Sequence, residues 1–106
     1  ARVNRLARTL IARGVGPEDR VALALRRGVD LVVAMYAVAR AGGAYVPVDP
    51  DQAAERTDYI LRTAAPVLVL TDRATGFTSD IAPVLAVDGA EVAVTPPAPV
   101  TDADRL

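Results

Sequence analysis

The stretch Ala39–Pro50, ARAGGAYVPVDP, decides how the fold is interpreted, because it holds two adjacent glycines beside a short apolar run. A phosphate-binding loop places its glycines after a strand and before a helix, where backbone N–H groups point at the anion. Gly42 and Gly43 stand in the opposite order, after an apolar helical segment and before a strand. The pair therefore predicts a helix end and a close backbone passage, and it argues against a nucleotide site.

The segments before the glycine pair alternate between helix and strand. Apolar residues recur at helical spacing from Val3 to Ile11, and Gly14 is expected to end that helix in a left-handed conformation. Residues 21–25 form a short continuous apolar run of the buried-strand type. A helix is predicted over Leu31–Ala41, with Asp30 as its cap or as an acid in its first turn.

The same alternation continues after the glycine pair. Residues 44–48 predict a strand, with Pro47 at a position where no backbone donor is required. The next helix begins either at Pro50, within a capping box over residues 49–52, or at Ala53, and it ends before Pro66. Strands follow at residues 67–70 and 84–87, with a loop or short helical turn over residues 74–80 between them.

Apolar strands that alternate with helices predict an α/β fold, a parallel sheet with flanking helices joined by right-handed crossovers. We expect one α/β unit over residues 1–94, and a Pro-rich extended linker over residues 95–106. The helix at residues 31–41 is apolar on nearly every side and is expected to pack on several sides. We therefore expect this chain to self-associate when it is alone.

Composition excludes several kinds of chemistry. The 106 residues include no cysteine and no histidine, and every positive charge is an arginine, with a net charge of −1. Thiolate chemistry, the usual zinc ligands and a lysine Schiff base are thereby absent, and no basic stripe favours nucleic acid or a membrane surface. No leader peptide or membrane-length apolar span is recognised, so a cytoplasmic location is expected. Because Ala1 already begins a helical pattern, the chain is interpreted as part of a longer one.

Three groups of residues are candidates for a functional site. Arg26 and Arg27 could meet an anion at the carboxyl end of a strand, although a solvated or interdomain pair is the favoured interpretation. Tyr45 is expected to pack against the fold. Four acids resemble a metal cluster but are interpreted as caps and as a solvated helical face: Asp49, Asp51, Glu55 and Asp58. No catalytic, cofactor-binding or metal-binding residue is therefore predicted in this chain.

The segment Val38–Asp49 resembles the second core motif of the adenylation domains of nonribosomal peptide synthetases, L-K-A-G-x-A-Y-V-P-[IL]-D. Ala39 replaces the leucine, Arg40 the lysine and Val48 the isoleucine or leucine. Residues 4–25 resemble the helix, turn and strand after the family's first motif, and residues 101–106 resemble the approach to its third. Residues 51–54 depart from the family, which often has an aromatic residue and a proline there, and this leaves the helix start open.

This resemblance implies an N-terminal fragment of an adenylate-forming ligase. The parent would use Mg-ATP to convert an amino acid to an acyl-adenylate, and would pass the acyl group to the phosphopantetheine thiol of a carrier protein. The family's phosphate loop, nucleotide contacts and catalytic lysine lie downstream, so the fragment itself is expected to be structural and inactive. Its expected partners are the remainder of the domain and the carrier and condensation domains of the parent. The alternatives are an acyl-CoA or aryl-acid ligase and a flavodoxin-like binding or interaction module.

Overall fold

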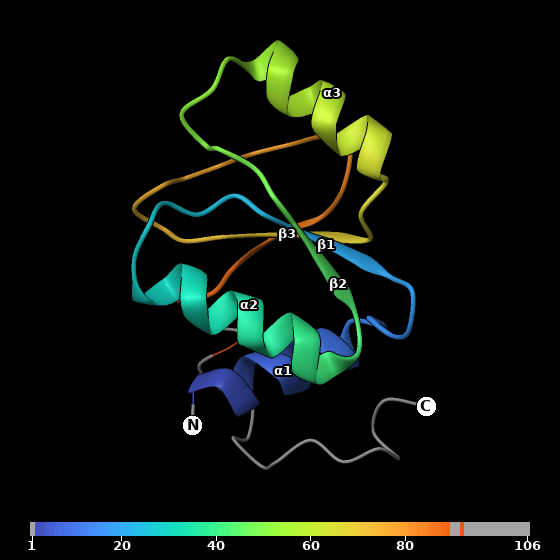
Figure 1. Cartoon of the computed structure of the whole chain (residues 1–106). Helices are drawn as coiled ribbons and strands as arrows, with labels where there is room; N and C mark the ends of the chain where they lie inside the picture. Colours follow the sequence, from blue (N-terminus) through green and yellow to red (C-terminus); the bar gives the residue numbers. More distant parts are fainter. Residues whose placement is uncertain (1, 90–91, 93–106) are drawn as a thin grey trace.

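The computed structural model describes residues 2–89 and Val92, and Figure 1 shows strands with helices above and below them. The sheet has four strands, and every strand pair is parallel, which confirms the predicted fold class. The predicted linker at residues 95–106 lies outside the described residues. The elements in chain order are α1 (Arg2–Ala12), β1 (Arg20–Leu23), α2 (Val29–Ala41), β2 (Ala44–Pro47), α3 (Ala54–Ala64), β3 (Leu68–Thr71) and β4 (Val84–Ala86).

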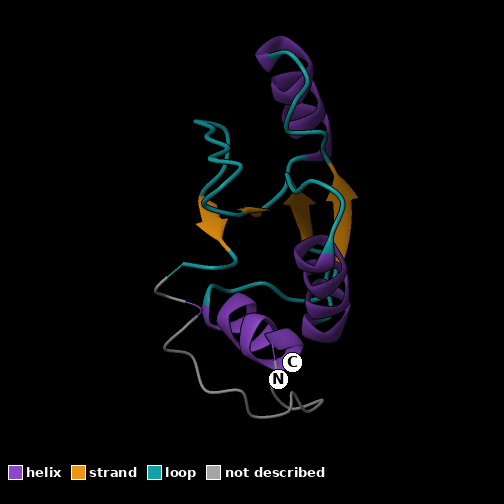
Figure 2. Ribbon diagram, turned by 90° about the vertical axis from the view of Figure 1, so that its left-hand side faces the viewer, coloured by secondary structure: helices purple, strands orange, loops and turns teal. Residues whose placement is uncertain are grey.

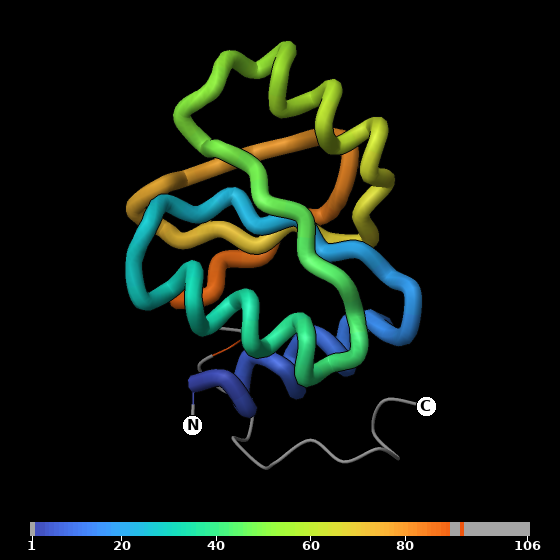
Figure 3. Tube along the Cα trace, in the orientation of Figure 1, coloured from blue at the N-terminus to red at the C-terminus, as the bar shows by residue number. Residues whose placement is uncertain are grey.

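The strand order in the sheet is β2-β1-β3-β4. The chain therefore moves from β1 to one edge of the sheet at β2, and then back across β1 toward the other edge. The first crossover carries α2 and moves from β1 to the edge strand β2. The second carries α3 and returns past β1 to β3, a path that Figure 3 follows. Crossovers of one hand that move in opposite directions place their helices on opposite faces. Figure 2 shows α3 on one side of the strands, and α1 and α2 on the other.

Two hydrophobic clusters hold these layers together. The larger cluster lies on the side of α1 and α2, and α1 contributes Leu6, Ala7 and Leu10 to it. The smaller cluster lies on the side of α3, which contributes Leu61 as its fully buried side chain. Alternate residues of β1 and the residue that follows it point to the two clusters: Val21 and Leu23 to the larger, and Ala22 and Ala24 to the smaller. This alternation is the strand periodicity that buries both faces of a parallel sheet.

The end of α1 confirms the predicted role of Gly14. Its φ is 91°, in the left-handed region. The Gly14 N–H donates to the Ile11 carbonyl at 2.9 Å, and the Val15 N–H donates to the Leu10 carbonyl at 3.0 Å. These two bonds form a Schellman motif, and the buried Val15 supplies the hydrophobic contact that accompanies it.

Gly42 and Gly43 close α2 in the same way. Gly42 has a φ of 94°, and its N–H donates to the Ala39 carbonyl at 3.1 Å. The Gly43 N–H donates to the Val38 carbonyl, also at 3.1 Å. Both amides are therefore engaged by the helix that they terminate.

Gly43 has a separate reason to be glycine, because the chain passes close to the turn before β1. A Cβ at this position would lie 3.0 Å from the Asp19 carbonyl oxygen and 3.2 Å from Val15 Cγ1. The next residue, Ala44, donates its N–H to that same carbonyl at 2.9 Å and begins the ladder between β1 and β2. The predicted close backbone passage is thus present.

Local boundaries differ from the predictions at two helix starts. The α3 helix begins at Ala54 with Ala53 as its N-cap, so the predicted start at Pro50 with a capping box over residues 49–52 is wrong, and the alternative start at Ala53 is correct to within one residue. Residues 50–52 form a turn instead, in which the Asp51 N–H donates to Asp49 Oδ1. The α2 helix begins at Val29, so Asp30 is a first-turn acid and makes no side-chain cap bond; it pairs with Arg2.

The outer side of α2 also differs from the expected packing on several sides. Its buried residues contact α1 and the sheet, but Val29, Val32 and Tyr36 are 69%, 50% and 63% exposed. In the described part of the chain, nothing covers that side.

None of the helices among the described residues has the length and apolarity needed to cross a membrane.

Candidate functional site

Open α/β sheets bind ligands at the carboxyl ends of their strands, so a site in this sheet is expected at that end. The strongest position is the switch point, where the connections of neighbouring strands leave toward opposite faces. It lies here between β1, which continues into α2, and β3, which continues into a loop on the α3 side. The candidate site is therefore built from the loops after β1, β2 and β3.

Two shallow cavities flank the loop after β1. The first, about 270 Å³, lies at the switch point; it is lined by Arg26, Arg27, Gly28, Val29, Asp30, Asp72, Ala74 and Thr75. The second, about 520 Å³, lies between the ends of β1 and β2; it is lined by Leu23, Leu25, Arg26, Arg27, Leu31, Pro47, Val48, Asp49, Pro50 and Asp51. The two predicted candidate arginines thus belong to both cavities.

Arg26 is held by an ion pair across the end of the sheet. Its Nε and Nη2 donate to the two carboxylate oxygens of Asp51, at 3.0 and 2.6 Å. The hydrogen bonds and the attraction of opposite charges raise the pKa of Arg26 and lower the pKa of Asp51. Because both side chains are more than half exposed, the pair contributes little to stability. Its effect is to join the loop after β1 to the loop after β2.

Arg27 differs from its neighbour, because no described residue pairs with it. It lies beside the amino terminus of α2, where Gly28 provides no side-chain cap. A free cation near uncapped N–H groups can attract an anion, but Arg27 is exposed and an exposed arginine is most simply solvated. The predicted pair is thus divided into one structural arginine and one solvated arginine.

Asp72 shapes the other wall of the switch-point cavity. The Thr75 N–H donates to Asp72 Oδ1 at 2.7 Å, which fixes the turn after β3. Hydrogen bonds from the Thr75 hydroxyl and N–H lower the pKa of Asp72, with a smaller contribution from the charge of Arg26. This pair was not predicted from the sequence, although an aspartate three residues before a threonine at a strand end is a signal for such a turn.

Three of the four acids that resemble a metal cluster have local structural roles, and the fourth, Asp58, is a partly exposed residue of α3. Asp51 binds Arg26, and Asp49 accepts the N–H of Asp51. Glu55 lies in the first turn of α3, where a negative charge favours the helix dipole. Within residues 2–89 and Val92, no group of three or more histidine, cysteine or acidic side chains could hold a metal ion.

The glycine pair lies at the amino ends of the strands, because it precedes β2, whereas these cavities lie at the carboxyl ends. Its two amides donate to helix carbonyls, so neither is directed at an open space.

The packing predicted for Tyr45 is wrong, since this side chain is 41% exposed. The reason is that β2 is an edge strand with a neighbour on one side only.

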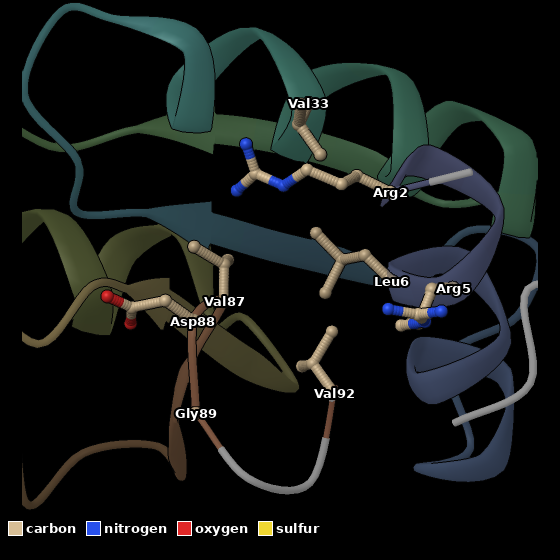
Figure 4. Close-up of a pocket in the computed structure, with 8 residues that line it drawn as sticks. All are labelled: Arg2, Arg5, Leu6, Val33, Val87, Asp88, Gly89 and Val92. Carbon is tan, nitrogen blue, oxygen red and sulfur yellow. The ribbon is translucent and has the colours of Figure 1, made fainter. Parts of the chain in front are cut away.

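A third cavity, about 250 Å³, lies between α1, α2 and the chain after β4 (Figure 4). Figure 4 shows the side chains of Leu6, Val33, Val87 and Val92 around it, while the Asp88 carboxylate points away from Arg5. Arg5 Nε is buried there without a hydrogen-bond partner. The lining combines these four aliphatic side chains with Arg2, Arg5 and Asp88, but Arg2 is paired with Asp30 and the Asp88 carboxylate points away, so we assign no ligand to this cavity.

One buried group near the site gives a stability prediction. Thr71, the last residue of β3, is 4% exposed, and its hydroxyl has no hydrogen-bond partner. Thr71→Val removes the unsatisfied hydroxyl and keeps the side-chain shape, so we expect the free energy of unfolding to rise by about 1 kcal/mol. Urea denaturation measures this change.

Thr57→Val is the matched control. Thr57 is also 4% exposed, but its hydroxyl donates to the Ala54 carbonyl at 3.0 Å. We expect this variant to lose about 1 kcal/mol. A loss of stability in Thr71→Val that equals the loss in Thr57→Val would contradict the assignment of an unsatisfied hydroxyl.

Comparison with known proteins shows to which family the chain belongs. The sequence profile described as "AMP-binding enzyme" matches residues 1–105. The chain is 49% identical over 71 residues to a dimodular nonribosomal peptide synthase of Bacillus subtilis (strain 168). It is 49% identical over 74 residues to CymA, a probable non-canonical nonribosomal peptide synthetase of Salinispora arenicola (strain CNS-205). The alignments cover 67% and 70% of this chain, but only 3% and 1% of the two relatives.

Solved structures give the same arrangement of elements. The AMPPNP-bound nonribosomal peptide synthetase FmoA3 matches 94% of this chain at 30% identity, with a TM-score of 0.86. ATP-bound MatB from Rhodopseudomonas palustris also matches 94% at 30% identity, with a TM-score of 0.76. The N-terminal subdomain of Klebsiella oxytoca NpsA, at 22% identity and a TM-score of 0.77, supports the fold alone. This chain spans 11%, 22% and 27% of those three chains.

Proposed function

Because the chain belongs to the AMP-binding enzyme family, we propose that it is an N-terminal piece of an amino-acid adenylation domain in a nonribosomal peptide synthetase. The main support is the likeness to FmoA3, which extends over 94% of the chain at 30% identity. The family motif at residues 38–49 also supports the proposal. Gly42 ends α2, and Gly43 allows the chain to pass close to the turn before β1, as expected of a motif with a structural role. The parent protein is then an AMP-forming ligase.

In the proposed parent, a carboxylate attacks the α-phosphate of ATP and releases pyrophosphate. This chemistry depends on charge neutralisation by cationic side chains, phosphate-binding amides and Mg²⁺. The described residues fit this chemistry poorly, because they hold no metal-binding group of acids, Arg26 is engaged by Asp51, and Arg27 is a single exposed cation. ATP and Mg²⁺ would therefore bind to other parts of the parent, and this chain would serve as part of its scaffold.

The partners follow from the proposed parent. The remainder of the adenylation domain would cover this chain, and the carrier and condensation domains would be its neighbours in the assembly line. The carrier would bear the phosphopantetheine that accepts the acyl group. We place the parent in the cytoplasm, where ATP and amino acids are supplied.

Amino-acid-dependent exchange of pyrophosphate into ATP tests this proposal. The 106-residue chain, incubated with Mg-ATP and mixed amino acids, should give no exchange above a heat-killed control. A longer polypeptide that continues beyond residue 106 should give exchange with an amino acid. Exchange by the short chain alone would contradict the scaffold role, and a longer chain active only on aryl or fatty acids would contradict the amino-acid assignment.

That last outcome describes the rival function, an acyl-CoA or aryl-acid ligase of the same family. The chain is 30% identical both to FmoA3 and to ATP-bound MatB, so its identity to solved structures does not by itself decide which carboxylic acid the parent uses. The described part of the chain contains no substrate pocket that would separate the two. The assay with several classes of carboxylic acid decides between them.

A further inference from the structure

The turn after β4 contains the sole Asp–Gly step of the sequence, Asp88–Gly89. Aspartate isomerises most readily before glycine, because a glycine has no side chain to shield its backbone nitrogen. Figure 4 labels both residues on the chain that leaves β4. The Asp88 side chain is 40% exposed, so water reaches it. The turn therefore holds all the groups that a spontaneous modification of the main chain needs.

The modification proceeds in two steps. The Gly89 nitrogen attacks Asp88 Cγ; an N–C bond forms, a C–O bond of the carboxyl group breaks, and the amide hydrogen leaves with that oxygen as water. Water then opens the five-membered imide ring at one of its two carbonyl carbons. Opening at Cγ restores aspartate, whereas opening at the α-carbonyl carbon gives isoaspartate, whose main chain runs through the former side chain and is one carbon longer.

The fold requires the glycine of this step. The Gly89 N–H donates to the Ala86 carbonyl at 3.0 Å and closes a β-turn over residues 86–89. A Cβ at residue 89 would lie 3.1 Å from that same carbonyl oxygen. Ala86 is the last residue of β4, so its carbonyl cannot move aside without disturbing the strand. A residue with a side chain is therefore disfavoured here, and the reactive step is retained.

The aspartate of this step is held by Arg73, in the loop after β3. The Arg73 N–H donates to Asp88 Oδ1 at 3.0 Å. The guanidinium Nε and Nη2 both donate to the Asp88 carbonyl oxygen, at 3.2 and 2.7 Å. One residue thus holds both the side chain and the main-chain carbonyl of the aspartate.

These contacts oppose the first step of the reaction. The Asp88 carbonyl and the Gly89 N–H belong to one planar peptide unit, which Arg73 holds by its oxygen and Ala86 by its hydrogen. For attack, the carboxyl carbon must turn onto the Gly89 nitrogen, and that nitrogen must release its hydrogen. Such a reaction is fast only when its atoms are already aligned, so here it must wait for the turn to open.

We infer that Asp88–Gly89 is a latent isomerisation site and that the Arg73 side chain keeps it unmodified in the folded chain. The damage would fall at the end of the sheet, because the Val87 N–H, just before the step, donates to the Thr71 carbonyl at 2.8 Å. The longer main chain of isoaspartate would separate residue 88 from Arg73 and loosen the link between the loops after β3 and β4. This inference is independent of the proposed function.

Incubation of the 106-residue chain at neutral pH tests the inference. Isoaspartate at residue 88 is measured by peptide mass spectrometry and by methylation with protein isoaspartyl methyltransferase. We expect it to form many-fold more slowly in the native chain than in the same chain unfolded in urea. Arg73→Ala should accelerate its formation several-fold, because the bonds to the Asp88 carbonyl are lost. Arg62→Ala, which removes an exposed arginine of α3, is the matched control and should leave the rate unchanged.

The Arg73 side chain is 75% exposed, so its truncation should leave the fold intact, which circular dichroism checks before incubation. Three results would overturn the inference. The native chain could isomerise as fast as the chain in urea, or Arg73→Ala could isomerise no faster than Arg62→Ala. Acceleration that occurs only because Arg73→Ala is globally unfolded would assign the protection to the fold as a whole and not to the guanidinium.

Discussion

Replacement of Leu61 by alanine is expected to lower the free energy of unfolding by about 2–5 kcal/mol, the largest change among our predictions. Leu61 is 0% exposed, and it is the large buried side chain by which α3 contacts the sheet. Much of the surrounding cluster consists of small residues, including Ala22, Ala24 and Ala82. Small neighbours have little side chain with which to fill the cavity, so the loss should lie toward the upper part of that range.

Urea denaturation of the monomeric chain, followed by circular dichroism, measures this loss. Tyr59→Ala is the matched control, since it truncates a large side chain of the same helix that is 62% exposed. We expect the control to change stability by less than about 0.5 kcal/mol. If the two variants were equally stable, the packing of α3 through Leu61 would be wrong.

Gly43→Ala is expected to lower the free energy of unfolding by about 1–3 kcal/mol, through overpacking and not through backbone strain. The new Cβ would lie 3.0 Å from a backbone oxygen, that of Asp19, which is itself held by the Ala44 N–H. A backbone atom within a ladder cannot rotate away as a side chain can. The substitution should therefore push the start of β2 away from β1.

Gly16→Ala separates this steric effect from the general effect of losing a glycine. A Cβ at residue 16 would meet its nearest neighbour, Asp19 Oδ2, at 3.9 Å, an ordinary contact distance. We expect this control to be neutral, or to raise stability by about 0.4–1 kcal/mol by restricting the unfolded chain. Thermal unfolding of both variants gives the comparison, and a Gly43→Ala variant as stable as Gly16→Ala would refute the close passage.

The helices and strands could be predicted largely from the spacing of apolar residues and from the glycines. Gly14 and Gly42 gave two helix ends correctly, because a left-handed residue after a helix strongly favours glycine. The start of α3 was less predictable, since Ala53 carries no side chain that could signal a cap. The strands shifted by one or two residues, because apolar runs continue past the hydrogen-bonded ladder, as at Leu25.

The candidate site was predictable in composition but not in geometry. Arg26 and Arg27 were recognised as strand-end residues, yet their different roles depend on Asp51, which is 25 residues from Arg26 in sequence. Asp72 and Thr75 were not recognised, although their local spacing carries a turn signal. The resemblance at residues 38–49 supplied the family, which composition and periodicity could not have given.

The sequence by itself determined the alternation of helices and strands, the parallel sheet and the structural role of the glycine pair. Each of these follows from local periodicity or from the conformational freedom of glycine, which act within a few residues. The tertiary structure alone decided the order β2-β1-β3-β4, the exposure of Tyr45 and the partner of Arg26. These depend on which segments meet in space, and a sheet edge or an ion pair exists only after distant parts of the chain have packed together.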